Sequence, residues 1–209
     1  MMKKNLLVGQ SGGPTAAINA TLAGVLSQAQ ISEQIDIVYG AFNGIEGVMQ
    51  ETFVNLTEKI PNTDAIHLLR QTPSAALGSC RYKLKDYNVC KEEYQKILDV
   101  FRKYNIGYFV YIGGNDSMDT VMKLSQYFKQ EGISDIFIMG APKTIDNDLM
   151  GTDHCPGFGS AAKYIATTFA ELVCDTNAYM QKSVTVVEVM GRNAGWLTAS
   201  SALARLSGG

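Results

Sequence analysis

Residues 143–148 place two carboxylates, an amide, a hydroxyl and a cation within one short segment. They follow an apolar run, residues 135–140, whose composition predicts a buried strand. Ligands of open α/β sheets bind at the carboxyl ends of strands, so this cluster is expected to lie at a binding site. In an extended segment Asp146 and Asp148 would point to the same side. Such a pair can share a metal ion, or one carboxylate can take a proton while the other holds charge. The alternative is a loop whose carboxylates cap backbone amides.

Glycine-rich turns follow two other predicted strands. Ser11-Gly12-Gly13 comes after the first strand, and Gly113-Gly114-Asn115-Asp116-Ser117 comes after a later apolar strand. Glycines at a junction of strand and helix let backbone amides approach an anion, which the start of a helix favours through its unpaired N–H groups and dipole. The two turns together predict one anion cradle. Neither has the spacing of a Walker loop or of a dinucleotide fingerprint. A tight turn with Asp116 or Ser117 as the helix cap is the alternative.

Basic residues mark two further segments. Arg81, Lys83 and Lys85 lie beside glycine and serine in residues 77–85, where they could hold phosphate. A solvated basic face is the alternative for this segment. Arg192 follows another predicted strand, and it could bind an anion or pair with a surface carboxylate.

Strands and helices alternate along the chain. Strands are expected at residues 6–9, 36–39, 106–112, 135–140 and 183–190, helices at 16–29, 45–49, 91–104, 118–129 and 158–176, and loops at 55–64 and 149–157. This alternation predicts an α/β fold with a doubly wound, mostly parallel sheet.

Composition narrows the class of protein. The chain has 209 residues, of which 46% are apolar and 18% charged, as expected for one large domain or one domain plus part of another. Its net charge of −2 gives no reason to expect nucleic-acid or membrane partners, and its apolar runs are too short to span a bilayer or to form a signal peptide. The four cysteines, Cys80, Cys90, Cys155 and Cys174, have no metal-ligand spacing, which predicts free thiols in a reducing cytoplasm.

The strand-end motifs, taken together, resemble the phosphofructokinase family over essentially the whole chain. The matching stretches are residues 11–13, 77–81, 113–117, 142–148 and 187–196. This family transfers a phosphoryl group to the 1-hydroxyl of fructose 6-phosphate, using magnesium, in glycolysis. The resemblance implies a Rossmann-like fold of phosphofructokinase type. It also implies a phosphoryl-donor-binding domain over residues 1–157 and the start of a fructose 6-phosphate-binding domain over residues 158–209.

The resemblance also implies roles for single residues. Asp146 matches the base that deprotonates the sugar hydroxyl, Thr144 helps to place the sugar, and Asp148 lies near the metal or the transferring group. Asn115 stands where the ATP-type motif has a metal-binding aspartate, so it would bind magnesium through an amide oxygen. The implied groups are catalytic (Asp146, Lys143, Thr144, Asp148), donor-binding and specificity-determining (Gly12, Arg81, Gly114, Asp116, Ser117, Lys143), and sugar-phosphate-binding (Thr144, Ile145, Asp146, Met190, Gly191, Arg192).

Two positions distinguish the phosphoryl donors. Asp116 and Lys143 stand where ATP-dependent members have glycine, so the chain resembles the pyrophosphate-dependent branch. A carboxylate at position 116 would fill the place of a nucleotide α-phosphate and repel it. Lys143 would supply a cation that stabilises charge in the transition state. The alternatives are an ATP-dependent 6-phosphofructokinase and a non-catalytic regulatory paralogue that only binds sugar phosphate.

The chain also departs from the family pattern. A phosphate-binding arginine is expected just before the strand at residues 183–190, where Lys182 and Ser183 stand instead. Family members continue well beyond residue 209, so we expect an amino-terminal fragment with an incomplete second lobe and doubtful activity on its own. The substrates implied are pyrophosphate and fructose 6-phosphate, in a cytoplasmic homo-oligomer that is a dimer or tetramer.

Overall fold

The computed structural model describes residues 3–206. The chain forms two compact units, Met1–Pro142 and Lys143–Gly209, which are described separately. The division between them falls directly after a strand, before the predicted polar cluster. The expected domains, 1–157 for the donor and 158–209 for the sugar phosphate, remain a proposal.

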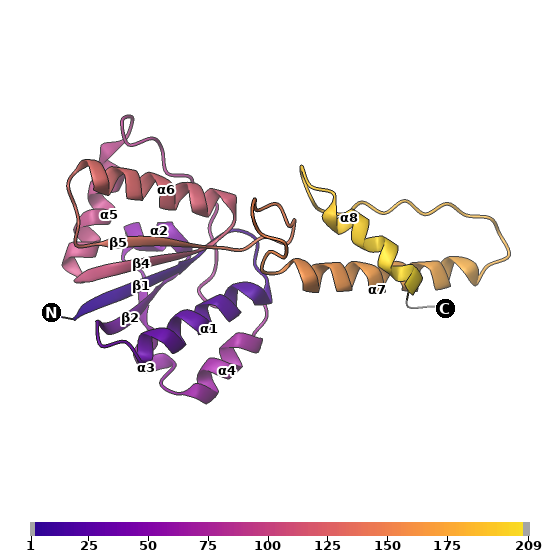
Figure 1. Ribbon diagram of the computed structural model, residues 1–209, viewed down its shortest axis with the longest axis horizontal. Coiled ribbons are helices and arrows are strands. Elements are labelled where there is room, and N and C mark those ends of the chain that lie inside the picture. The colour runs from indigo at the N-terminus through magenta and orange to yellow at the C-terminus, as the bar shows by residue number, and fades with distance from the viewer. Residues whose placement is uncertain (1–2, 207–209) are drawn as a thin grey trace. The chain divides into compact units, whose positions relative to one another are not determined.

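A five-stranded sheet with the order β3-β2-β1-β4-β5 forms the centre of the first unit (Figure 1). The strands are β1 (Lys4–Gln10), β2 (Ile35–Ala41), β3 (Phe53–Asn55), β4 (Ile106–Gly113) and β5 (Phe137–Pro142). β1 pairs in parallel with β2 and β4, β5 pairs in parallel with β4, and β3 pairs antiparallel with β2. The predicted doubly wound, mostly parallel sheet is therefore confirmed.

Helices cover both faces of this sheet (Figure 1). One face carries α1 (Ala16–Gln30), α3 (Leu56–Lys59) and α4 (Thr63–Gln71), and the other carries α2 (Gly44–Gln50), α5 (Lys91–Lys103) and α6 (Asn115–Gln130). The alternation of side chains along β1 explains the two cores, because Leu6 and Val8 pack with the α1 side while Leu7 packs with the α5 side. Both faces of a parallel strand are buried in this way.

The loop predicted at residues 55–64 is wrong, because α3 and the start of α4 occupy much of it. Two asparagines start these helices. The Asn55 side chain accepts a hydrogen bond from Glu58 N (3.3 Å), and the Asn62 side chain accepts one from Ala65 N (2.9 Å). Pro61 does interrupt the helical structure, but it separates two capped helices and does not lie in a long loop.

β5 is less buried than its apolar sequence predicts. The side chains of Phe137 and Met139 are 60% and 65% exposed. The reason is position, since β5 is the edge strand of the sheet and α6 packs over its other face. The polar cluster nevertheless follows this strand, as predicted, because β5 ends at Pro142.

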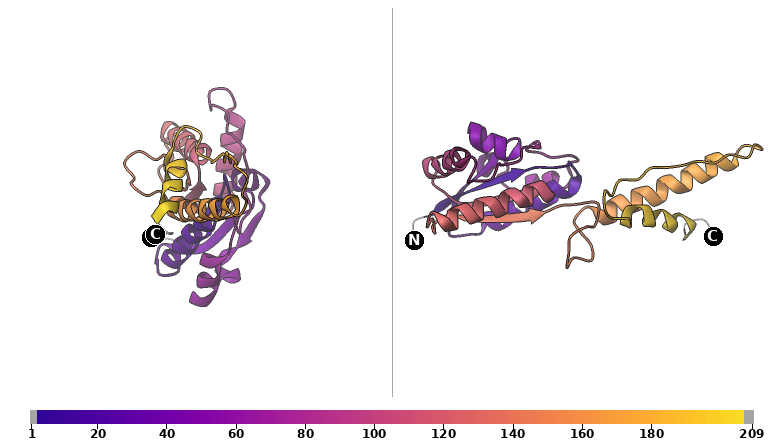
Figure 2. Two further views of the ribbon diagram at one scale, coloured as in Figure 1. Left: turned by 90° about the vertical axis from the view of Figure 1, so that its right-hand side faces the viewer. Right: turned by 90° about the horizontal axis from the view of Figure 1, so that it is seen from above.

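The second unit contains α7 (Phe158–Asn177), α8 (Trp196–Ser200) and the 3₁₀ helix η1 (Ser201–Leu206). Between α7 and α8 the chain runs back along α7 as an extended segment (Figure 2). The strand predicted at residues 183–190 is wrong, because this segment pairs with no strand among the described residues. Val184 and Val186 are 91% and 90% exposed. A valine-rich segment forms a strand only when a neighbouring strand supplies hydrogen bonds and side-chain contacts.

Across residues 3–206, none of the helices combines the length and apolar character needed to cross a membrane.

Candidate functional site

The two glycine turns of the first unit lie side by side. β1 and β4 are neighbours in the sheet, and the helices that follow them, α1 and α6, lie on opposite faces. This is the topological switch point, where open α/β sheets bind ligands. Gly12 has a φ of 80°, and a Cβ atom on it would lie 3.3 Å from Gly114 N. Glycine suits this close approach and this positive φ, and the two turns lie at one place, as the sequence predicts.

Helix starts at this place leave polar groups available to an anion. Gly114 is the N-cap of α6 and Thr15 is the N-cap of α1, and neither supplies a side-chain cap hydrogen bond. The alternative in which Asp116 or Ser117 is the N-cap is therefore wrong. Ser117 is 2% exposed, and within the described residues its hydroxyl has no hydrogen-bond partner. A buried hydroxyl without a partner in the first turn of a helix suits an anion that accepts from it.

A buried glutamine holds a third segment next to the glycine turns. Gln10, the last residue of β1, is fully buried. Its Nε2 donates to Asn19 Oδ1 (3.0 Å), and its Oε1 accepts from Leu77 N (2.8 Å). Because Gln10 lies in the sheet and Leu77 lies in the loop before the basic cluster, this amide fixes the loop to the end of β1.

The loop continues directly along the first glycine turn. Ser79 Oγ donates to Gly12 O (2.5 Å), and Ser11 Oγ donates to Cys80 O (3.0 Å). These contacts place the exposed Arg81 just beyond the turn. The structure thus brings together, within the first unit, the predicted residues Gly12, Arg81 and Gly114.

An ion pair links the basic cluster to α6. Lys83 Nζ lies 3.0 Å from Asp116 Oδ1, and both side chains are largely exposed. Asp116 therefore does not present an uncompensated negative charge. The sequence analysis includes Lys83 among three basic residues that could hold phosphate, but not among the donor-binding residues. The regular spacing of Arg81, Lys83 and Lys85 was the only signal in the sequence, and the partner of Lys83 depends on the fold.

The predicted catalytic residues form a hydrogen-bonded loop in the second unit. Thr144 Oγ1 donates to Asp148 Oδ1 (2.9 Å) and accepts from Asp146 N (3.1 Å). Asn147 has a φ of 57°, so the segment is not extended there. The expectation that Asp146 and Asp148 point to one side of an extended segment therefore does not apply, and the Thr144 hydroxyl connects them instead.

Lys143 is the charged residue at the start of this loop. Its side chain is 6% exposed, although lysine is seldom buried to this degree. Burial lowers the pKa of the Lys143 ammonium below its ordinary value, and the negative charge of Asp146 opposes part of this shift. The lysine follows Pro142, which pairs in register with Gly113. Because Lys143 is buried, it is not an ordinary surface lysine.

The predicted sugar-phosphate residues lie farther along the second unit. Met190 is 70% exposed, Arg192 is exposed, and Gly191 begins a turn that Ala194 N closes by donating to Gly191 O (2.5 Å). The contacts that hold Thr144, Asp146 and Asp148 together involve none of these three residues. Their role, like that of Ile145, stays a prediction.

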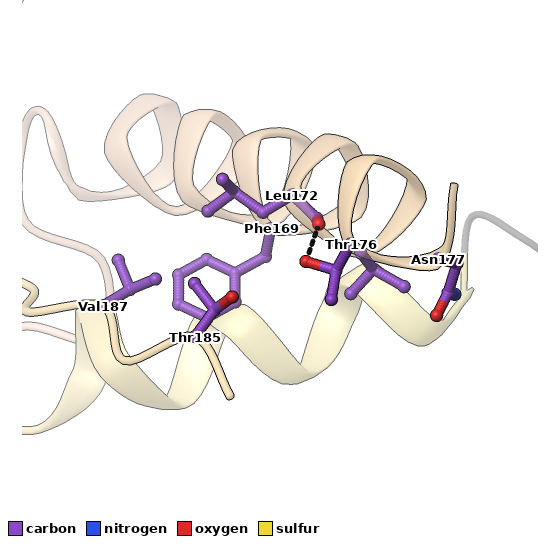
Figure 3. A pocket seen from close by; sticks show the side chains of 7 residues that line it. Phe169, Leu172, Thr176, Asn177, Thr185 and Val187 are labelled. Carbon is purple, nitrogen blue, oxygen red and sulfur yellow. Dashed lines mark hydrogen bonds between the residues drawn. The ribbon is translucent and has the colours of Figure 1, made fainter. Parts of the chain in front are cut away.

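A pocket of about 200 Å³ lies in the second unit between α7 and the extended segment (Figure 3). Its lining residues are Phe169, Leu172, Val173, Thr176, Asn177, Thr185 and Val187. The Thr176 hydroxyl donates to Leu172 O (2.7 Å), so its hydrogen is already used. The lining carries no charge and includes none of the predicted site residues, so this pocket does not suit a phosphate.

The side chains that could bind magnesium are few. No group of three histidine, cysteine, aspartate or glutamate side chains among residues 3–206 is arranged to hold a metal ion. Asn115 is exposed in the first turn of α6, and Asp148 is exposed in its loop. Magnesium is often held by one or two carboxylates together with the phosphates of a substrate. An amide oxygen such as that of Asn115, in the first unit, suits an ion that is bound mainly through a phosphate substrate, and the assignment of Asn115 stays a prediction.

Comparison with known proteins agrees with this geometry. A family model described as "Phosphofructokinase" matches residues 5–207. The chain is 47% identical over 206 residues to the pyrophosphate–fructose 6-phosphate 1-phosphotransferase of Xanthomonas campestris pv. campestris, and 45% identical over 207 residues to that of Methylococcus capsulatus. These alignments cover 98% of this chain but 48% and 49% of the two relatives.

A solved structure gives the same result. The pyrophosphate-dependent phosphofructokinase of Nitrosospira multiformis matches with a TM-score of 0.87 and 45% identity, over 96% of this chain and 49% of that one. The chain therefore spans about half the length of the relatives that it matches.

Lys143 should make stability depend on pH in an unusual direction. Its pKa is lower in the folded than in the unfolded state, so the unfolded chain binds more protons between these two values. The free energy of unfolding of the unmodified protein, minus that of Lys143→Met, should therefore increase as the pH rises towards the ordinary lysine pKa of about 10. Urea unfolding of both proteins at several pH values measures this difference.

Lys91→Met provides a control of opposite sign. A hydrogen bond to Glu131 raises the pKa of Lys91, so its contribution to stability should be lost as the pH rises. For Lys143→Met, a stability difference from the unmodified protein that decreases with pH, as we expect for Lys91→Met, would contradict the interpretation of Lys143 as a buried ammonium.

Proposed function

Because this chain belongs to the phosphofructokinase family, as the match over residues 5–207 shows, we propose that it serves magnesium-dependent phosphoryl transfer from pyrophosphate to the 1-hydroxyl of fructose 6-phosphate. The product is fructose 1,6-bisphosphate. The observation that carries this proposal is the pair of adjacent glycine turns with the unpartnered Ser117 hydroxyl, because this arrangement suits a small polyanion. The names of the relatives from Xanthomonas and Methylococcus support pyrophosphate as that anion.

In the proposed mechanism Asp146 takes the proton of the sugar 1-hydroxyl, whose oxygen attacks one phosphorus of pyrophosphate in line, while the bond to the bridging oxygen breaks and inorganic phosphate leaves. Asp146 is half-buried and its backbone N–H donates to Thr144 Oγ1, which supports a fixed position for a base. Thr144 also binds Asp148, so one hydroxyl orients both acidic residues. Lys143 neutralises charge that develops on the donor. Magnesium, held through Asn115 and donor oxygens, would supply further positive charge.

Donor selection in this proposal rests on Asp116, Lys143 and Lys83. The Asp116 side chain lies in the first turn of α6, where a glycine would leave room for a nucleotide α-phosphate. The ion pair with Lys83 changes the expected role of charge, because the carboxylate is compensated. Asp116 can therefore exclude ATP by its volume while Lys83 removes the repulsion that pyrophosphate would otherwise meet.

Other parts of the proposal rest on family membership alone. They are a place in glycolysis or its reverse, a cytoplasmic location, and a homo-oligomeric assembly. Sugar-phosphate binding by Met190, Gly191 and Arg192 belongs to the same set.

Asp146→Asn tests the assignment of the base. An amide cannot take the proton, so kcat in the full-length gene product should fall by about 100- to 10,000-fold. The affinity for fructose 6-phosphate, measured by calorimetry, should change little because the amide keeps the size of the side chain. Asp153→Asn is the matched control, since Asp153 is an exposed aspartate of the same loop that accepts a hydrogen bond from Asn147 Nδ2 (3.0 Å) with its backbone oxygen. Equal turnover of the unmodified and Asp146→Asn proteins would exclude Asp146 as the base.

Replacing both donor-selecting residues by glycine should change the donor. The unmodified full-length gene product should phosphorylate fructose 6-phosphate with pyrophosphate and not with ATP, because Asp116 occupies the space that a nucleotide needs. Asp116→Gly combined with Lys143→Gly should lose activity with pyrophosphate and gain activity with ATP. Initial rates with each donor at fixed magnesium measure this ratio. Turnover with ATP by the unmodified protein would refute the donor assignment and favour an ATP-dependent enzyme.

Lys83→Met should weaken pyrophosphate binding through the unpaired Asp116 charge. We expect KM for pyrophosphate to rise by about tenfold, as for the loss of a charge-assisted contact. The same change made in an Asp116→Gly background should have a smaller effect, because no uncompensated carboxylate remains. Steady-state kinetics with varied pyrophosphate measure both effects.

Stability provides the control for Lys83. An exposed ion pair contributes at most about 1 kcal/mol to the free energy of unfolding, so Lys83→Met should remain folded. Lys91→Met removes another exposed ion pair, with Glu131, and should leave KM unchanged. If Lys83→Met raised KM for pyrophosphate equally with Asp116 present and in the Asp116→Gly background, the ion pair would not act on the donor.

A further inference from the structure

Asn147 separates the two acidic residues of the catalytic loop and differs from both in its environment. It is 8% exposed, whereas Asp146 is half-buried and Asp148 is exposed. Its φ of 57° lies in the left-handed region, which asparagine tolerates better than most residues with a side chain. The mechanism proposed above gives this residue no role.

Both ends of the Asn147 amide are bonded to the backbone of a later part of the loop. Its Oδ1 accepts from Cys155 N (2.8 Å), and its Nδ2 donates to Asp153 O (3.0 Å). Cys155 is 3% exposed, so the first bond is shielded from water. A buried N–H that lost this acceptor would be left unsatisfied.

The same loop is closed at its base by a different contact. Thr144 and Gly157 form an isolated parallel bridge. The segment from Thr144 to Gly157 is therefore a compact surface loop whose ends meet, of the kind that is often functional. The bridge fixes the two ends, and Asn147 fixes the middle. The Thr144 hydroxyl contacts Asp146 N and Asp148 Oδ1 from the start of the loop, and the Asn147 contacts tie the same backbone to its later half.

Glycine, alanine and aspartate each lack something that this amide supplies. Glycine accepts the left-handed conformation but makes neither bond. Alanine makes neither bond and strains the backbone at positive φ. Aspartate can accept from Cys155 N but, when ionised, cannot donate to Asp153 O. The requirement for a left-handed backbone, an acceptor and a donor at one position selects asparagine.

We propose that Asn147 is a positioning residue that holds the backbone between Asp146 and Asp148 in its reactive conformation by anchoring it to residues 153–155. This inference rests on the proposed function in assigning a reaction to the two carboxylates, whereas the anchor itself belongs to the loop. A displacement of about 1 Å at a reacting group can reduce turnover about 100-fold. Asn147 therefore acts on kcat through Asp146, without touching either substrate.

Asn147→Gly and Asn147→Ala test this inference in the full-length gene product. Asn147→Gly keeps the backbone conformation and removes both bonds, so kcat should fall by about ten- to 100-fold. KM for pyrophosphate should stay within about twofold, because the anchored loop acts on the phosphoryl transfer and not on donor binding. Asn147→Ala should be at least as impaired. Hydrogen exchange should become faster at the amides of Cys155 and Asp146 in both variants.

Asn105 provides matched controls, because it also has a positive φ, of 50°, but lies in an exposed turn of the first unit. Asn105→Gly and Asn105→Ala should leave kcat unchanged, which separates general backbone strain from the loss of the anchor.

Normal turnover of Asn147→Gly in an active protein would overturn the inference. Normal turnover of Asn147→Gly with impaired Asn147→Ala would also overturn it, since the backbone conformation alone would then matter. If the unmodified protein transfers no phosphoryl group from pyrophosphate, the proposed function fails, and hydrogen exchange alone decides the anchor. Unchanged exchange at Cys155 and Asp146 in Asn147→Gly would then refute it.

Discussion

The parallel pairing of β1 with β4 is the constraint on which the first unit depends. It aligns the carboxyl ends of two strands that are far apart in the sequence, with Gln10 opposite Ile112. The turn that follows each strand must then share a small space with the other, and glycine suits position 12 because its φ is 80° and a Cβ atom would lie 3.3 Å from Gly114 N. The helices leave this point on opposite faces of the sheet. Their first turns therefore bring N–H groups and dipoles towards one position, which is why the site is suited to an anion.

Buried amides hold the loops of both units. Gln10 joins the end of β1 to the loop before Arg81, and Asn147 joins the two halves of the loop that carries Asp146. Each amide can donate and accept at once, so each satisfies backbone groups from two directions. A charged side chain in the same place would need a paired counter-charge to offset its desolvation. Neutral amides can therefore fix the loops without adding to the electrostatic field of the site.

Charge is distributed unevenly over the candidate residues. Asp116 and Lys83 form an exposed pair whose contribution to stability is small. Lys143, in contrast, is buried, and its ammonium is disfavoured by desolvation. A protein retains such a lysine at a cost in folding free energy, which is typical of functional positions. The two lysines thus differ in physical role: Lys83 balances a neighbouring carboxylate, and Lys143 keeps a cation in a place of low polarity.

The sequence alone determined the alternating strands and helices, the glycine turns, and the polar cluster after residue 142, because these follow from local periodicity and turn chemistry. Tertiary structure decided the features that depend on distant neighbours. Residues 183–190 have strand composition but no strand beside them, and Phe137 is exposed because β5 is an edge. The partner of Asp116 and the anchor formed by Asn147 were likewise hidden. Pattern and spacing report what a segment can form, whereas pairing and burial depend on which other segments the fold brings to it.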